Sequence, residues 1–233
     1  MEGNTKKPYI IEFNGLPGSG KTTIANALQK ELESAGLTVK RFYLRTRLFR
    51  SPRILYFMPQ YWVQLKNAAD YAKLLPKRTY MRRILSMIHY FKMYQEFVRD
   101  EVADYLIIDQ GIVQSFISLA HQDTFPKSNE LAGVLRKLRL NEFPLILINC
   151  NINEQLSNER IASRPSNGCR VESMSEEDRR RTLYVQLENF ALIRKLIKQE
   201  YPQISVLEVD TEKTIKESVY MILRRIGKKS IMY

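Results

Sequence analysis

Residues 15–22 read Gly-Leu-Pro-Gly-Ser-Gly-Lys-Thr, and this stretch decides the fold. It matches the pattern G-x-x-x-x-G-K-[ST] at every fixed position. The preceding run, residues 9–13, is short, mostly apolar and β-prone, and helical sequence begins at Lys21. A strand that enters a glycine-rich turn and leaves it as a helix is the context in which this pattern forms a phosphate-binding loop, or P-loop.

The residue types in the loop indicate what it binds. Glycines allow the backbone to curl tightly, so that successive N–H groups converge on one phosphate, and the positive end of the following helix adds to the attraction. Lys21 can reach the β- and γ-phosphates, and the Thr22 hydroxyl can bind Mg²⁺. The sequence therefore predicts ATP with Mg²⁺ as the cofactor, and GTP is the less favoured nucleotide. The expected cofactor contacts come from Gly15, Pro17, Gly18, Ser19, Gly20, Lys21, Thr22 and Thr23.

Strands and helices alternate along the rest of the chain. The remaining strands are expected at about 39–44, 105–109, 144–149 and 204–209. Helices are expected at about 21–34, 54–74, 79–102, 112–121, 127–140, 153–163 and 212–226, and from Ser173 or Ser175 onward. The alternation predicts an α/β fold, with one P-loop NTPase domain over residues 1–233 and a doubly wound, mostly parallel five-stranded sheet flanked by helices. Ligands of such sheets bind at the carboxyl ends of the strands.

The net charge of +12 is concentrated in one segment. Residues 40–92 hold 13 Lys or Arg against a single acid, Asp70, together with 11 of the chain's 24 Phe, Tyr and Trp residues. Arginine beside aromatic rings suits a flat or phosphorylated acceptor, but also a nucleic-acid strand or an anionic membrane surface. Two amphipathic helices that expose Lys and Arg and bury their aromatic rings would have the same composition. The sequence leaves these interpretations open.

Two further motifs accompany the loop. Asp109-Gln-Gly111 ends the third expected strand, and an Arg-rich segment containing Arg160, Arg164 and Arg170 follows the fourth. Together with the loop, they resemble the P-loop kinases of the thymidylate kinase type, a branch of the nucleoside monophosphate kinases. The resemblance implies a helical lid at about 160–175, whose three arginines would close over the phosphates and stabilise the charge of a phosphoryl transition state. A solvated helix face is the alternative interpretation of Arg160 and Arg164.

Asp109 ends an apolar strand at the edge where ligands bind. It could bind Mg²⁺, directly or through water, or accept the proton of an attacking hydroxyl group. It could also cap the helix that follows. The sequence does not separate these roles.

The acceptor side departs from the thymidylate kinase pattern. Members of that family carry a Glu-Pro pair after the second strand and an Arg after the Asp of the third. Here the second strand runs into Arg41-Phe-Tyr-Leu-Arg-Thr-Arg47, and position 110 is Gln. We therefore expect a different acceptor, bound by a helical segment at about 45–102, with Arg45, Arg47 and Gln110 as candidate contacts.

These observations favour an ATP-dependent phosphotransferase that moves the γ-phosphoryl group to a small anionic acceptor, such as a nucleotide or another phosphorylated metabolite. A P-loop ATPase or nucleotide switch is the first alternative, although the guanine-specific tetrapeptide Asn-Lys-x-Asp does not occur in the chain. A kinase of polynucleotide 5′-hydroxyl ends and a polyanion-binding module are the others. A homodimer stays open in each case.

The sequence also bears on where the protein resides. It contains no uncharged apolar run of 18 residues, and residues 1–13 lack the apolar stretch of a signal peptide. The two cysteines, Cys150 and Cys169, form neither a disulfide framework nor a metal-ligand pattern. We therefore expect a cytoplasmic protein.

Overall fold

The computed structural model describes residues 8–42, 77–100, 103–117, 128–164 and 171–230. Within these ranges, five strands form one sheet in the order β2-β3-β1-β4-β5, and every neighbouring pair is parallel. The strands are β1 (Tyr9–Gly15), β2 (Val39–Phe42), β3 (Tyr105–Ile108), β4 (Leu145–Asn151) and β5 (Ser205–Asp210). The predicted α/β class with a five-stranded parallel sheet is therefore confirmed.

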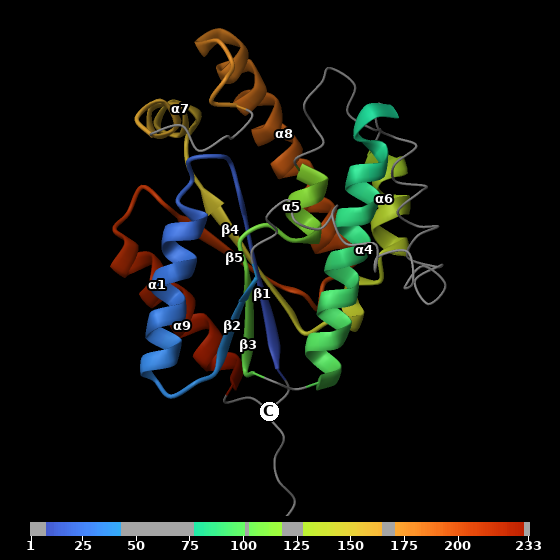
Figure 1. Cartoon of the computed structure of the whole chain (residues 1–233), viewed down its shortest axis with the longest axis vertical. Helices are drawn as coiled ribbons and strands as arrows, with labels where there is room; N and C mark the ends of the chain where they lie inside the picture. The colour runs from blue at the N-terminus through green and yellow to red at the C-terminus, as the bar shows by residue number, and fades with distance from the viewer. Residues whose placement is uncertain (1–7, 43–76, 101–102, 118–127, 165–170, 231–233) are drawn as a thin grey trace, which may run out of the picture.

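Helices cover both faces of this sheet (Figure 1). One face is covered by α1 (Lys21–Ser34) and α9 (Ile215–Ser230). The other is covered by α4 (Lys77–Asp100), α5 (Ile112–Ile117), α6 (Ser128–Lys137) and α8 (Glu176–Glu200). The short helix α7 (Glu154–Ala162) follows β4, and a 3-10 turn (Leu140–Glu142) precedes it. In the described parts of the chain, no helix is both long enough and apolar enough to cross a bilayer.

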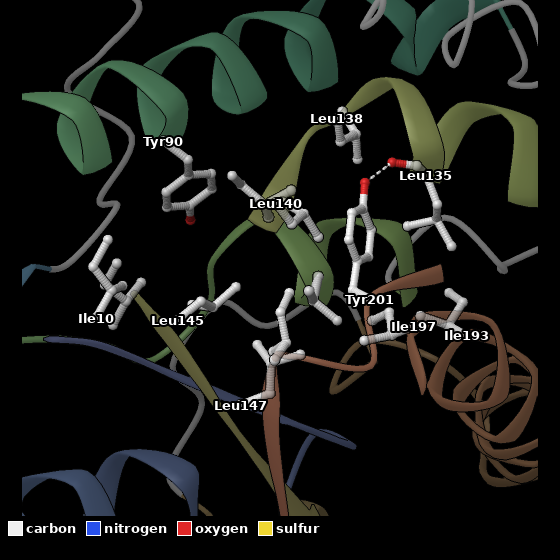
Figure 2. Packing of buried hydrophobic residues seen from close by; sticks show 14 of the residues in the cluster. Ile10, Tyr90, Leu135, Leu138, Leu140, Leu145, Leu147, Ile193, Ile197 and Tyr201 are labelled. Atoms are coloured by element: carbon white, nitrogen blue, oxygen red, sulfur yellow. Dashed lines mark hydrogen bonds between the residues drawn. The ribbon is translucent and has the colours of Figure 1, made fainter. Parts of the chain in front are cut away.

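The central strands are apolar on both sides because helices bury both of their faces. In β1, Ile10 belongs to the core cluster beneath α4, α6 and α8, whereas Ile11 and Phe13 belong to the cluster beneath α1 and α9. Figure 2 shows the first cluster, in which the Tyr201 hydroxyl donates a hydrogen bond to the carbonyl oxygen of Leu135. Packing from both sides holds the strands in place, and with them the loops at their carboxyl ends.

The register of the sheet sets which residues meet at its carboxyl edge. Gly15 at the end of β1 pairs with Cys150 of β4, and Glu12 of β1 pairs with Ile108 at the end of β3. Asp109 follows Ile108 and therefore lies beside the carboxyl end of β1, where the P-loop begins.

Two boundaries near β4 differ from the sequence prediction. The helix expected to reach residue 140 ends at Lys137. Arg139 takes a left-handed conformation with φ 51°, which a right-handed helix does not accommodate. β4 is longer than expected and runs to Asn151, because Asn151 still pairs with Asp210 of β5.

The last helix also starts later than expected, at Ile215 rather than residue 212. The Glu217 backbone N–H donates to the Thr214 hydroxyl, and the Thr214 backbone N–H donates to the Glu217 carboxylate. This reciprocal pair is a capping box, which starts a helix directly after its first residue. The helix expected at 54–74 lies outside the described residues.

Candidate nucleotide-binding and phosphotransfer site

The P-loop occupies the connection between β1 and α1. Gly18 and Gly20 have φ values of 83° and 78°, in the left-handed region that glycine adopts without strain. A Cβ at Gly18 would also come within 2.8 Å of the Ser157 carbonyl oxygen. Gly20 is the N-cap of α1 and offers no side-chain cap, so the first N–H groups of α1 are left for a ligand. The loop therefore has the backbone geometry of a phosphate cradle.

The polar side chains of the loop suit a magnesium nucleotide. The Lys21 ammonium group donates to the carbonyl oxygens of Gly15 at 2.8 Å and Leu16 at 2.7 Å, so it lies against the loop itself. Thr22 and Thr23 in the first turn of α1 are exposed and accessible to a ligand. An ammonium group beside converging amides fits phosphates, and a threonine hydroxyl fits Mg²⁺. In the described residues, no group of three or more His, Cys, Asp or Glu could hold a metal ion.

Asp109 lies one residue beyond β3 and is only 8% exposed. Its Oδ1 forms an ion pair with Arg41 of β2, with 2.5 Å between Nη2 and Oδ1. Capping of the following helix was one role considered for Asp109. In the first turn of that helix, α5, the Gln114 backbone N–H donates to a different carboxylate, that of Glu12. Sequence reasoning missed Arg41. Arg41 is the last residue but one of β2, and it reaches Asp109 only because β2 pairs with β3.

Glu12 is a buried carboxyl group in the middle of β1. Its Oε2 accepts from the Tyr94 hydroxyl at 2.9 Å and its Oε1 from the Gln114 backbone N–H at 2.9 Å. Burial raises the pKa of Glu12 to about 7, although hydrogen bonds from Gln114, Tyr94, Val113 and Ile112 act in the opposite direction. The side chain of Gln114 in turn accepts from the Gly15 backbone N–H at 2.8 Å. Sequence reasoning did not identify Glu12, and the signal that could have done so is a lone acid in a mostly apolar strand.

On the other side, α7 packs directly on the P-loop. The Ser157 hydroxyl donates to the Pro17 carbonyl oxygen at 2.6 Å, and a Cβ on Gly18 would meet both Ser157 and Ile161. Arg160 on the same helix does not point to the loop. It donates to the carbonyl oxygen of Thr211, in the turn after β5, at 3.1 Å.

The remaining site residues expected from the sequence are either exposed or outside the described residues. Arg164 and Gln110 are exposed, and no contact between either and the P-loop defines a role. Arg45, Arg47 and Arg170 lie outside the described residues. The acceptor side of the site therefore rests on prediction alone.

A second polar cluster lies where α8 crosses β4 and β5. The Arg194 guanidinium donates to Asn151 at 2.9 Å and to Glu208 at 2.8 Å. Burial would raise the pKa of Glu208, but hydrogen bonds from Asn149 and Asn151 and the charge of Arg194 hold it below its usual value. A pocket of about 210 Å³ lies between this cluster and the start of the P-loop. It is lined by Gly15, Leu16, Cys150, Asn151, Ile152, Leu187, Phe190 and Arg194.

Cys150 lines that pocket but does not have the properties of a nucleophile. The residue is 3% exposed, and burial raises the pKa of its thiol to about 12. A thiol that keeps its proton at neutral pH is unreactive. The chemistry of the site therefore depends on the P-loop and on Asp109.

Comparison with solved structures identifies the fold. Three structures of deoxyadenosine kinase from M. mycoides each cover 94% of this chain, and the chain covers 99% of each. The structure with bound dATP has a TM-score of 0.54 and 17% identity, and the one with bound dCTP has 0.53 and 16%. The third, with dCMP and dCDP, has 0.52 and 15%. The chain has a P-loop kinase fold. At these identities the likeness concerns the fold alone.

Sequence comparison points to a second group of kinases. The family model for adenylylsulphate kinase matches residues 7–118, which include the P-loop and Asp109. A probable adenylyl-sulfate kinase from Archaeoglobus fulgidus is 29% identical over 101 residues, which are 42% of this chain. The aligned part spans 63% of that relative, a little under two thirds of its length. The part of the chain after residue 118 lies outside the family match.

Proposed function

We propose that the protein is an ATP-dependent kinase that transfers the γ-phosphoryl group to a small acceptor carrying a nucleoside or nucleotide. The observation that carries the proposal is the juxtaposition of the P-loop with Asp109 at the carboxyl edge of the sheet. The adenylyl-sulfate and deoxyadenosine kinases named above support this acceptor class, because both act on compounds that contain an adenine nucleoside. Among the P-loop kinases, we propose that the protein is of the thymidylate kinase type.

Catalysis would come from positioning and charge neutralisation. The P-loop amides and Lys21 would hold the β- and γ-phosphates, and Thr22 and Asp109 would hold Mg²⁺. The metal ion supplies positive charge to the phosphoryl oxygens when it is bound. Arg41 binds one oxygen of Asp109, and we assign the second oxygen to a metal-bound water or to the acceptor hydroxyl.

The acceptor side and the lid complete the proposal. We assign the lid to residues 160–175 of a single domain, with Arg160, Arg164 and Arg170 supplying guanidinium groups to the transferring phosphoryl group. Arg160 would have to leave Thr211 to do so. Arg45, Arg47 and Gln110 are the proposed contacts to the acceptor.

The proposal is tested by measuring ADP formation from ATP and Mg²⁺ with a panel of acceptors. The panel contains adenylyl sulfate, deoxynucleosides, nucleoside monophosphates and 5′-hydroxyl oligonucleotides. We expect ADP formation to require one of the small acceptors and to fall at least about 100-fold in Lys21→Ala, because Lys21 is the P-loop cation expected to reach the β- and γ-phosphates. Lys30→Ala is the matched control, since Lys30 is exposed on the same helix, α1, and nine residues further along it.

Other outcomes would assign the protein to another class. ATP hydrolysis without any acceptor would contradict the kinase proposal and favour an ATPase or nucleotide switch. Phosphorylation of the oligonucleotide alone would favour a polynucleotide kinase. Absence of turnover, together with polyanion binding that weakens steeply with salt, would favour a binding module.

A further inference from the structure

Glu12 has no part in the proposed phosphotransfer, yet it lies at the centre of the fold. It is 0% exposed in β1, the middle strand of a parallel sheet, where side chains are normally apolar. A buried carboxyl group destabilises the fold unless hydrogen bonds compensate for the loss of water. Both of its oxygens are used in this way, by Tyr94 of α4 and by Gln114 of α5.

Gln114 extends this arrangement to the P-loop. Its backbone N–H donates to Glu12, and its side-chain oxygen accepts from the backbone N–H of Gly15. The carbonyl oxygen of Gly15 accepts from the Lys21 ammonium group at 2.8 Å. Both backbone groups of Gly15 are therefore bound, one by Gln114 and the other by the lysine that the nucleotide needs.

Close packing leaves this cluster little room to shift. A Cβ at Gly111 would lie 2.4 Å from the carboxyl carbon of Glu12 and 2.5 Å from the Tyr94 hydroxyl oxygen. Gly111 belongs to the short connection that carries Asp109. The cluster therefore contacts β1, α4 and the β3–α5 connection, and it is bonded to the first residue of the P-loop.

We propose that Glu12, Tyr94 and Gln114 form a positioning unit that holds Gly15 and thereby keeps the P-loop in the shape that binds ATP. Tyr94 makes α4 part of this unit. Because α4 belongs to the segment proposed to hold the acceptor, the unit connects the two halves of the active site. It rests on the nucleotide site of the proposed function, and all three of its side chains are buried.

The test is the affinity for ATP with Mg²⁺, measured by titration calorimetry, which needs no acceptor. Gln114→Leu removes the acceptor of the Gly15 N–H, and we expect it to weaken ATP binding about tenfold or more. Tyr94→Phe removes one hydrogen bond to Glu12 and keeps the ring, so we expect a smaller loss of about threefold. Tyr201→Phe is the matched control, because it also removes a buried tyrosine hydroxyl bond in the same core, to Leu135 of α6 (Figure 2).

The unfolding temperature of each variant, measured without nucleotide, separates positioning from stability. Tyr94→Phe and Tyr201→Phe should lower it by similar amounts, and only Tyr94→Phe should weaken ATP binding. ATP affinity of Tyr94→Phe and Gln114→Leu equal to that of the wild type would overturn the proposal. The same holds if Tyr201→Phe weakens binding as much as Tyr94→Phe.

The double variant Tyr94→Phe/Gln114→Leu tests whether the residues act together. If Tyr94 acts on Gly15 through Glu12 and Gln114, the combined loss of affinity should be smaller than the product of the two single losses. A loss equal to that product would contradict a shared unit. A wild-type protein that does not bind ATP would overturn the nucleotide site itself, and the proposed function with it.

Discussion

At the scale of single residues, the charged side chains of the site differ in the groups that bind them. The Lys21 ammonium group donates to backbone carbonyl oxygens, and Arg41 is paired with Asp109. Glu12 differs from them, because no cation is bonded to it in the described structure and its partners are a hydroxyl group and backbone amides. Its ionisation therefore depends on pH near neutrality.

This difference predicts a pH-dependent stability. The pKa of Glu12 is raised from 4.5 to about 7, so between these values the folded protein keeps a proton that the unfolded chain releases. The free energy of unfolding should fall as pH rises through this range, by about 3 kcal/mol, and change little further above it. Tyr94, the titratable side chain bonded to Glu12, stays neutral here because burial raises its pKa well above 10.

Glu12→Gln isolates this effect, since the amide cannot titrate. Both proteins are unfolded in urea from pH 5 to pH 8. The free energy of unfolding of the variant should rise relative to that of the wild type as the pH rises, by about 3 kcal/mol at the upper end of the range. If the free energies of unfolding of the two proteins change with pH in parallel, Glu12 does not titrate in this range.

At the scale of helices and strands, the P-loop is held between two helices. α5 binds Gly15 through Gln114, and α7 binds Pro17 through Ser157. Helix α1 begins at Lys21 of the loop, so the conformation at the end of this helix is as important for the structure as the packing of its buried face. Two glycines near helix ends differ in this respect, because Gly36 has a left-handed conformation and Gly227 lies inside α9.

Replacing two helix glycines by alanine should have opposite effects. Gly227 lies inside α9, where a Cβ would meet nothing within 4 Å, so Gly227→Ala should stabilise the protein by about 0.5–1 kcal/mol. Gly36 follows α1 with φ 80°, and a Cβ there would also meet nothing, so Gly36→Ala should destabilise it by about 1 kcal/mol through backbone strain alone. Thermal unfolding of both variants tests the pair. A loss of stability in Gly227→Ala would mean that α9 packs more tightly there than the structure shows.

At the scale of the whole molecule, nucleotide binding and folding are linked. The P-loop joins the central strand to α1, and α1 packs against α9 over the core cluster beneath these two helices. A ligand that binds only the folded loop must therefore stabilise the entire domain.

We expect ATP with Mg²⁺, at 100 times its dissociation constant, to raise the free energy of unfolding by about 2.7 kcal/mol. For a chain of this length that corresponds to an increase in Tm of roughly 5–10 °C. The increase should be absent in Lys21→Ala at the same concentration and present in Lys30→Ala. An equal increase in all three proteins would show that the nucleotide binds elsewhere.

The sequence by itself determined the α/β class, the strands and the P-loop, because these depend on local patterns. Apolar runs mark buried strands, and the spacing of glycine, lysine and threonine in 15–22 is confined to one turn. Asp109 was also recognisable, since it ends an apolar strand at the edge where ligands bind.

The tertiary structure alone decided which distant residues meet. Gln114 and Glu12 stand 102 positions apart, and Arg41 and Asp109 stand 68 apart. No local pattern specifies such pairs, because they depend on the strand order β2-β3-β1-β4-β5 and on its register. Arg160 illustrates the same limit: its helix was predicted, but only the tertiary structure brings its guanidinium group to Thr211 in the turn after β5.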